Sequence, residues 1–352
     1  MKLLLLNQFD GQSSAPTGRI LQELGDTLTA DGHEIVVIAT SDRYGKPVKG
    51  KARLLREAKA HLYLLWRGIS QSKVDGVISL TSPAFLPVTA SLIALRHQAR
   101  HYHWAMDLYP EVALILGEAV PCPGFFRRLM GLAYRHAAKV VALDEDMRDH
   151  IRSTYGTDTA VIEPTPPEIE WPATQPSRRC WLYSGNFGRA HDIDILLDVQ
   201  KALEASGSPA WLILQGDGPQ FLKTQDRARE MGIKQVKWNG PVPMADLGKS
   251  LLEADVLVVT RKPELKGILL PSKLVLAELS GKSVLWIGDT DGRTAQRLRA
   301  DGRHGVFTVA DTLAITQWLQ GVFSDQVKPR DPVPVSSRRA EIGNRWKSLL
   351  AG

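Results

Sequence analysis

The chain has 352 residues, of which 43% are hydrophobic and 23% are charged, and its formal net charge is +6. These values are typical of a globular protein with room for two domains, and they exclude a wholly disordered chain. The positive balance favours an anionic partner such as a nucleotide, a lipid diphosphate or an acidic membrane surface, without choosing among them.

The cysteines and the start of the chain indicate a cellular compartment. Cys122 and Cys180 form no disulfide framework, which favours a reducing compartment. The apolar run at 3–6 is broken by Asn7 and is too short for a secretory signal, so we predict a buried strand there. No run approaches the ~18 apolar residues of a membrane-spanning helix. We therefore expect a cytoplasmic protein.

The first 165 residues alternate between predicted strands and helices. A strand at 3–6 leads through a loop to a helix at 18–30, and a second strand follows at 34–39. This opening is half of a Rossmann unit, whose ligands lie beyond the carboxyl ends of the strands. The loop contains no Gly-x-Gly-x-x-Gly, which argues against a nicotinamide enzyme. Gly18 could offer its backbone to a phosphate, or simply begin the helix.

A basic stretch follows at 43–67, with eight Lys or Arg residues and one acidic residue. Its apolar residues recur at helical spacing, and Tyr63 and Trp66 lie near its end. Such a helix suits contact with an anionic membrane surface. The alternative is a domain helix with a solvated basic face.

Asp107 lies just past the carboxyl end of the predicted strand at 101–105, which is the ligand side of a parallel sheet. We predict a ligand contact for Asp107, and the alternative is that it caps the next helix. The remaining elements of this half are strands at 77–80 and 140–143 and helices at 83–95, 125–138 and 146–154.

A Pro-rich segment at 166–178 is the predicted linker between an N-terminal domain at 1–165 and a C-terminal domain at 179–330. Residues 331–352 are expected to form a helix that packs back on the N-terminal domain. The predicted fold class is α/β, with two doubly wound Rossmann-like domains facing each other across a cleft. In the second domain we expect strands at 180–183, 211–215, 236–239, 256–260, 284–287 and 306–309, and helices at 192–205, 220–230, 244–253, 272–280 and 311–322.

A glycine-rich turn at 184–188 joins a predicted strand to a predicted helix in the second domain. Unpaired N–H groups of such a turn lie at the positive end of the helix dipole, where a phosphate fits. Arg189 adds a cation with a bidentate fork. We therefore predict a diphosphate cradle that uses Gly185, Asn186, Gly188 and His191, although a histidine at a helix start is as often structural.

A second helix start, at Pro271-Ser272-Lys273, offers the Ser272 N–H and the Lys273 ammonium to the same diphosphate. A lysine there opposes the helix dipole, so a nearby anion would explain its presence; the alternative is a surface lysine. Another predicted strand is followed by Gly216, Asp217 and Gly218. The glycines could let the backbone approach a ligand, or they could simply form a tight turn.

Five segments, taken in chain order, resemble segments of the retaining family-4 glycosyltransferases of the GT-B fold, and together they span most of the chain. The Asp-Leu-Tyr-Pro and Pro-Ser-Lys forms are similar to those of bacterial members that build surface polysaccharides. The five segments are 15–19, 106–111, 183–191, 215–219 and 267–273.

The resemblance implies that a hexosyl or N-acetylhexosaminyl group moves, with retention, from a nucleoside-diphosphate sugar such as a UDP-sugar to a hydroxyl of a lipid-linked saccharide. Asp107, Arg189 and Lys273 would be the catalytic residues, with the two cations on the diphosphate, and Val242 would lie beside the base. The reaction would need no cofactor and no metal. We expect a cytoplasmic or peripheral protein on the inner face of the plasma membrane, and no nucleic-acid partner.

The chain departs from this family at two positions. Most members carry two glutamates eight positions apart, which contact the donor, and the matching residues here are Ile268 and Leu276. Glu278 is close but out of register. A non-catalytic GT-B protein that binds a nucleotide or a partner is therefore the alternative.

Overall fold

The computed structural model describes residues 1–11, 15–40, 50–173, 179–324 and 328–352. The chain divides into two compact units, the first made of 1–165, 267–270 and 339–352 and the second of 166–266 and 271–338. The segment 267–270, expected in the second domain, thus belongs to the first unit. Residues 43–49 of the basic stretch and 174–178 of the predicted linker lie outside the described residues.

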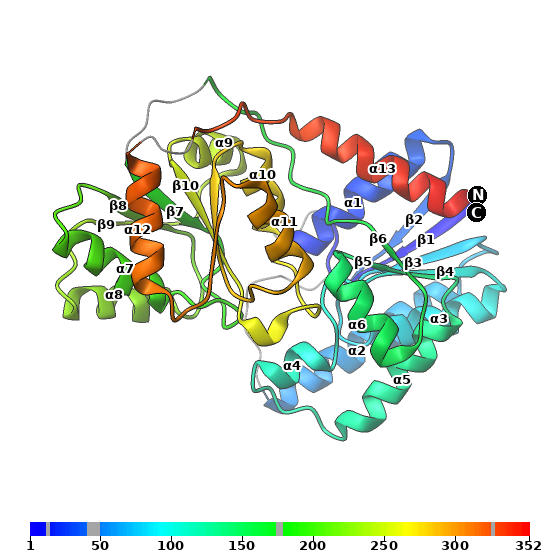
Figure 1. The fold of residues 1–352 in the computed structure, drawn as a ribbon. Coiled ribbons are helices and arrows are strands. Elements are labelled where there is room, and N and C mark those ends of the chain that lie inside the picture. The colour runs from blue at the N-terminus through cyan, green and yellow to red at the C-terminus, as the bar shows by residue number, and fades with distance from the viewer. Residues whose placement is uncertain (12–14, 41–49, 174–178, 325–327) are drawn as a thin grey trace. The chain divides into compact units, whose positions relative to one another are not determined.

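The first unit is built on a six-stranded parallel sheet with the order β2-β1-β3-β4-β5-β6 (Figure 1). In the register, Leu4 of β1 lies between Val36 of β2 and Val77 of β3. A strand buried on both faces has a continuous apolar sequence, which explains why four consecutive leucines occur in the interior strand β1. The strands are β1 Lys2–Leu6, β2 Glu34–Ile38, β3 Gly76–Ser79, β4 Arg100–Trp104, β5 Lys139–Ala142 and β6 Thr159–Val161.

Helices cover both faces of this sheet, with α1 and α13 on one face and α2, α3 and α5 on the other (Figure 1). Ion pairs join α13 to α1, including Arg339 with Glu23 at 2.8 Å. Trp346 of α13 packs edge-on against Trp104 of β4, with ring centroids 5.1 Å apart. The helices are α1 Pro16–Ala30, α2 Gly50–Ile69, α3 Leu86–His97, α4 Glu111–Ile115, α5 Pro123–His136, α6 Glu145–Tyr155 and α13 Val335–Ala351.

The second unit contains another six-stranded parallel sheet, with the order β12-β11-β10-β7-β8-β9. The strand order runs outward from β7 in one direction and from β10 in the other. In doubly wound sheets, ligands bind beyond the carboxyl ends of the strands at such a switch point. The strands are β7 Cys180–Ser184, β8 Trp211–Gln215, β9 Val236–Asn239, β10 Val256–Thr260, β11 Ser283–Ile287 and β12 Gly305–Phe307.

The core of the second unit lies between this sheet and the helices α7, α8 and α12 (Figure 1). Leu196 of α7, Leu214 of β8 and Leu319 of α12 are fully buried in it. The helices of this unit are α7 Asp194–Ala205, α8 Phe221–Glu230, α9 Met244–Leu252, α10 Lys273–Leu279, α11 Arg293–Asp301 and α12 Thr312–Phe323, with a short 3₁₀ helix η1 at Pro263–Leu265.

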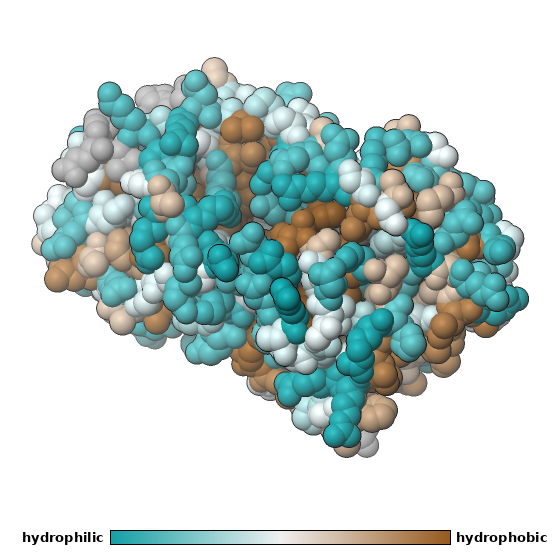
Figure 2. All heavy atoms as spheres, turned by 45° about the vertical axis from the view of Figure 1, so that its right-hand side comes forward, coloured by the Kyte–Doolittle hydropathy of each residue, from teal (hydrophilic) through white to brown (hydrophobic). Residues whose placement is uncertain are grey.

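Hydrophilic residues cover most of the face of the molecule seen in Figure 2, and apolar residues form smaller patches. Helix α2 of the first unit is an exception, because Leu55, Leu62 and Trp66 are 58%, 67% and 60% exposed. Within the described ranges, we find no helix whose length and apolar character would let it cross a membrane.

Candidate functional site

The carboxyl ends of β7 and β10 meet at the switch point of the second unit. There the turn that follows β7 is tied to the end of β10. The Nδ1 atom of His191 lies 2.6 Å from the carbonyl oxygen of Thr260, the last residue of β10. The Lys262 N–H donates to the carbonyl of Ala190 at 3.0 Å. The segment predicted to hold a diphosphate is therefore fixed at the place where this fold binds ligands.

Glycines shape this turn together with the turn that follows β8. Gly185, Gly216 and Gly218 have φ angles of 142°, 135° and 134°, which favour glycine. A Cβ on Gly216 would collide with the carbonyl of Gly185, and one on Gly218 would lie 2.7 Å from the Phe187 nitrogen. The two turns touch so closely that side chains at Gly216 and Gly218 are excluded.

Backbone hydrogen bonds join the same two turns, since Gly185 N–H donates to Gln215 at 2.9 Å and Phe187 N–H donates to Asp217 at 2.7 Å. The Gly185 N–H is therefore already paired, in contrast to the unpaired donor expected from the sequence. Gly185 has a different role: a Cβ there would lie 3.0 Å from the Nζ atom of Lys273. The glycine makes room for the lysine.

Lys273 is the first residue of α10, and its ammonium lies 3.5 Å from the centre of the Tyr183 ring. The Nζ atom is buried and has no hydrogen-bond partner among the described residues. Burial lowers the pKa of Lys273 well below its usual value. A buried ammonium is costly unless it is paired, and a ring face compensates only part of that cost, so a bound anion would stabilise this atom.

His191 lies beside this lysine as a neutral imidazole. Its Nδ1–H donates to the Thr260 carbonyl, so Nε2 keeps its lone pair. Burial, and then the charge of Lys273, lower the pKa of His191 to about 3. A neutral acceptor next to a buried cation suits a ligand that presents a hydroxyl beside an anionic group.

The other predicted residues of this unit lie farther out. Arg189, Asn186 and Asp217 have exposed side chains, as does Ser272, the N-cap of α10. The carbonyl of Gly188 accepts hydrogen bonds from the His191 N–H and from Gln220. Val242 follows the edge strand β9, which is separated from β7 by β8.

Sequence reasoning missed a buried ion pair next to this turn. Arg261 directly follows β10 and is fully buried, and its guanidinium pairs with Asp289, which lies just beyond β11. The guanidinium also lies 4.9 Å from the Trp286 ring, and Trp286 Nε1 donates to the Asp289 carbonyl at 2.8 Å. The available signal in the sequence was that each of the two charged residues lies within two positions of the end of an apolar strand.

No carboxylate occupies the two positions where the resembling family has glutamates. Ile268 and Leu276 are 5% and 6% exposed, and Glu278 pairs with Arg297. Within the described part of the chain, no three His, Cys, Asp or Glu side chains are grouped so that they could hold a metal ion.

In the first unit, Asp107 lies beyond the carboxyl end of β4. The N-cap of α4 is Pro110, so Asp107 does not cap that helix. Asp107 forms an isolated antiparallel bridge with Leu269, and burial raises its pKa to about 6. The N–H of Gly18, the other candidate in this unit, donates to Ala15 within the first turn of α1 at 3.1 Å.

Replacing Asp107 with asparagine is expected to stabilise the protein at pH 7.5 and to have less effect at pH 4.5. A raised carboxyl pKa makes folding favour the protonated form, so this stability is present below pH 3.8 and is lost as pH rises through about 6. Urea unfolding should give a variant more stable by about 1–2 kcal/mol at pH 7.5. An equal difference at both pH values would contradict the burial of this carboxyl.

The chain is similar in sequence to known proteins. Residues 169–270 match the family described as glycosyl transferases group 1. The probable glycosyltransferase WbjE of Pseudomonas aeruginosa is 25% identical over 302 residues, which are 76% of this chain and 74% of that protein.

Solved structures agree over the full length. The apo form of the lipopolysaccharide outer core galactosyltransferase WaaB has a TM-score of 0.67 at 17% identity over 99% of both chains. HepE of Anabaena, solved in complex with UDP, has a TM-score of 0.69 at 14% identity over 100% of both chains. Part of the chain is thus similar to the group 1 glycosyltransferases, and the chain has the GT-B fold of these solved structures, with two Rossmann-like units.

Proposed function

We propose that this protein is a glycosyltransferase that moves a sugar from a nucleoside-diphosphate sugar to a saccharide in the assembly of cell-surface polysaccharide. The buried ammonium of Lys273, with no acceptor among the described residues at the switch point of the second unit, carries this proposal. Sugar transfer leaves a diphosphate with additional negative charge, and a fixed cation at that place stabilises the transition state. The match of residues 169–270 supports the same function.

In this proposal Lys273 binds the departing diphosphate from within the fold, and Arg189 reaches it from the exposed rim of the turn. The Nε2 atom of His191 accepts a hydrogen bond from a sugar hydroxyl. The ring is neutral, so Nε2 has a lone pair for the hydroxyl proton and no proton to donate to a phosphate oxygen. The double turn of Gly185–Gly188 and Gly216–Gly218 lines the nucleotide, with the Ser272 N–H on the diphosphate and Val242 near the base.

The same proposal includes the donor, the acceptor and the stereochemistry of the transfer. The donor is a UDP-sugar with a hexosyl or N-acetylhexosaminyl group, and the acceptor is a lipid-linked saccharide, with Asp107 on one of their hydroxyls. Transfer proceeds with retention, because the departing phosphate takes the proton of the acceptor hydroxyl and no enzymic nucleophile is needed. The two cations supply the charge, so the proposal requires no metal.

We place the protein in the cytoplasm, in peripheral contact with the inner face of the plasma membrane through α2. Leu62 and Trp66 of this helix are exposed, and Arg67 adds positive charge beside them. Apolar side chains with flanking cations suit the interface of an anionic membrane.

Replacing Arg189 with alanine is expected to lower kcat/KM for the donor about tenfold, because an exposed charge is screened by solvent and salt and acts more weakly than a buried one. Steady-state rates at low and moderate salt measure the change. The matched control is Arg229→Ala, which removes an exposed arginine from α8 that pairs with Asp226. A variant at position 189 that keeps the full rate at low salt would remove Arg189 from the site.

Thermal unfolding with UDP, GDP and their sugars tests the function directly. A bound donor at 100 times its Kd should stabilise the protein by about 2.7 kcal/mol. Donor hydrolysis and transfer to a lipid-linked saccharide are then measured with the donor that stabilises the protein most. Binding without turnover would favour a non-catalytic nucleotide-binding subunit, and no stabilisation by any nucleotide would reject both functions.

A further inference from the structure

Three polar side chains of the second unit form a hydrogen-bonded network that links the end of β7 to helix α9. Ser184 and Gln215 are the last residues of β7 and β8, and they are paired in the register of the sheet. The Gln215 Nε2 atom donates to the Ser184 hydroxyl at 3.0 Å. The hydroxyl of Ser250, on α9, donates to the Gln215 Oε1 atom at 2.7 Å. The network therefore ends on a hydroxyl at the carboxyl edge of the sheet.

Burial and two hydrogen bonds fix the side chain of Gln215. This residue is only 2% exposed, and its backbone carbonyl accepts a hydrogen bond from the Gly185 N–H at 2.9 Å. Because Ser250 donates to the amide oxygen, the amide nitrogen faces Ser184. An amide nitrogen is only a donor, so Gln215 cannot accept the proton of the Ser184 hydroxyl.

The proton of the Ser184 hydroxyl is therefore turned away from Gln215. A hydroxyl has one proton and two lone pairs, and the bond from Gln215 occupies one lone pair. This hydroxyl donates to no acceptor among the described residues, and Ser184 is partly exposed. The proton is thus available to a ligand beyond the end of β7, where a doubly wound sheet binds its ligands.

The surroundings of Ser184 indicate the kind of oxygen that would accept this proton. The next residue is Gly185, and a Cβ there would lie 3.0 Å from the Nζ atom of Lys273. A cation and an oriented donor therefore lie at the same end of β7. Phosphate oxygens only accept hydrogen bonds, so they suit a hydroxyl whose proton is directed outward. A sugar hydroxyl can also donate, so it would not require this orientation.

We propose that the Ser184 hydroxyl donates a hydrogen bond to a phosphate oxygen of the nucleoside-diphosphate donor, and that Gln215 is a positioning residue that directs this bond. The inference rests on the proposed function, because it assigns further residues to the same site. If Gln215 only tied the two strands to α9, its loss would weaken the binding of every ligand of this site alike.

Equilibrium binding of UDP and uridine to the full chain tests the role of Ser184, by calorimetry for UDP and by ligand-observed NMR for uridine. Ser184→Ala should weaken UDP binding about tenfold, the scale of one hydrogen bond to a charged group. Uridine has no phosphate, so it should bind the wild type and the variant equally. An equal loss for both ligands, or no loss for UDP, would overturn the proposal. If GDP stabilises the protein more than UDP does, GDP and guanosine replace these two ligands.

A double-mutant cycle tests the positioning role of Gln215. Gln215→Met removes both hydrogen bonds of the amide, and it should weaken UDP binding by about two- to tenfold, a usual range for coupled neighbours. In the Ser184→Ala background the same change should have no further effect, because no hydroxyl is left to direct. Additive losses, or a Gln215→Met protein with full UDP affinity, would overturn this role. Melting curves verify that each variant is folded.

The matched control is a second serine–glutamine pair of the same unit. The Gln320 Nε2 atom donates to the hydroxyl of Ser206 at 2.9 Å, and Ser206 is the C-cap of α7, at the amino edge of the sheet. Ser206→Ala and Gln320→Met should leave UDP affinity unchanged. Losses as large as those in Ser184→Ala and Gln215→Met would overturn the proposal, because the position of the pair would then not matter.

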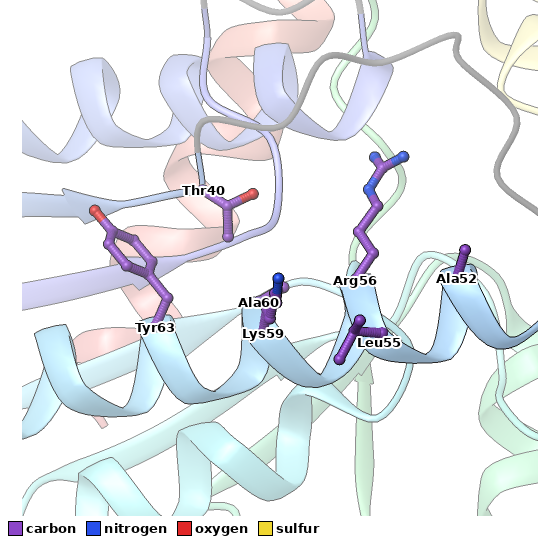
Figure 3. Close-up of a pocket in the computed structure, with 7 residues that line it drawn as sticks. All are labelled: Thr40, Ala52, Leu55, Arg56, Lys59, Ala60 and Tyr63. Carbon is purple, nitrogen blue, oxygen red and sulfur yellow. The ribbon is translucent and has the colours of Figure 1, made fainter.

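A last variant tests for phosphate binding in the first unit. Figure 3 shows Lys59 among the residues of α2 that line a cavity there. Lys59→Gln removes this cation and should not change UDP affinity, whereas a loss as large as that in Ser184→Ala would overturn the proposal. The proposed function fails separately. A wild type that binds no nucleotide would reject that function and this inference together, but equal UDP affinity in the wild type and Ser184→Ala would remove only the inference.

Discussion

Replacing Lys273 with methionine is expected to lower turnover at least about 100-fold, the scale for losing one group that stabilises transition-state charge. The same change should raise the free energy of unfolding by about 1–3 kcal/mol, the usual cost of a buried polar group without a partner. Both effects have their reason in the environment of the Lys273 Nζ atom. This atom is buried beside Gly185 and the Tyr183 ring, and it has no acceptor among the described residues. Opposite effects on activity and stability mark a functional site.

The pH dependence of stability gives an independent readout for Lys273. Because burial lowers its pKa, the unfolded chain binds more protons below pH 10.5, and the wild type gains stability as pH rises towards that value. The Lys273→Met variant should lack this rise in stability below pH 10.5. Urea unfolding across that range measures both curves.

Lys282 provides the matched control. It is another buried lysine of the second unit, but it directly precedes β11 and therefore lies at the amino edge of the sheet. Lys282→Met should leave turnover per folded molecule unchanged. Equal losses in the two variants would mean that a buried lysine matters here for folding rather than for the diphosphate. A Lys273→Met protein that is fully active would reject the role of this residue.

Much of the fold follows from local patterns in the sequence. The strands at 211–215, 236–239 and 256–260 form with the expected bounds. The run at 256–260 is buried throughout, because a run this apolar is stable only inside a covered sheet. Asp144 caps α6 by accepting a hydrogen bond from Met147 N–H at 2.7 Å, and an aspartate before a polar helical segment is a local signal for such a cap. Helix α11 was not predicted: it is strongly polar, and only three of its residues are buried, Thr294, Ala295 and Leu298.

The sequence predicts only those features of the candidate site that depend on residues close to one another in the chain. Glycines between strands and helices locate the double turn, and a lysine at a helix start is an electrostatic anomaly visible in the sequence. The contact between Lys273 and Tyr183 joins residues 90 positions apart, and no local pattern encodes it. The same holds for Arg261 and Asp289, which become partners only because β10 and β11 are neighbours in the sheet.

Replacing Arg261 with methionine is expected to destabilise the protein by about 3–5 kcal/mol, the cost of removing one partner of a buried ion pair. Arg261 is fully buried and Asp289 is 6% exposed, so the remaining carboxylate cannot be solvated. The unfolding midpoint in urea measures the change. The double variant Arg261→Met/Asp289→Asn removes both charges, and it should recover most of the lost stability.

The same variants separate a role in folding from a role at the site. The backbone of Arg261 connects Thr260, which holds His191, to Lys262, which holds Ala190. If the ion pair positions this backbone, the double variant should be stable and yet bind UDP more weakly than the wild type, while turnover at saturating donor changes little. A double variant as unstable as Arg261→Met would show that the charge of Asp289 is not the cause. Wild-type UDP affinity in a stable double variant would restrict the pair to supporting the fold, because the turn would then keep its geometry without it.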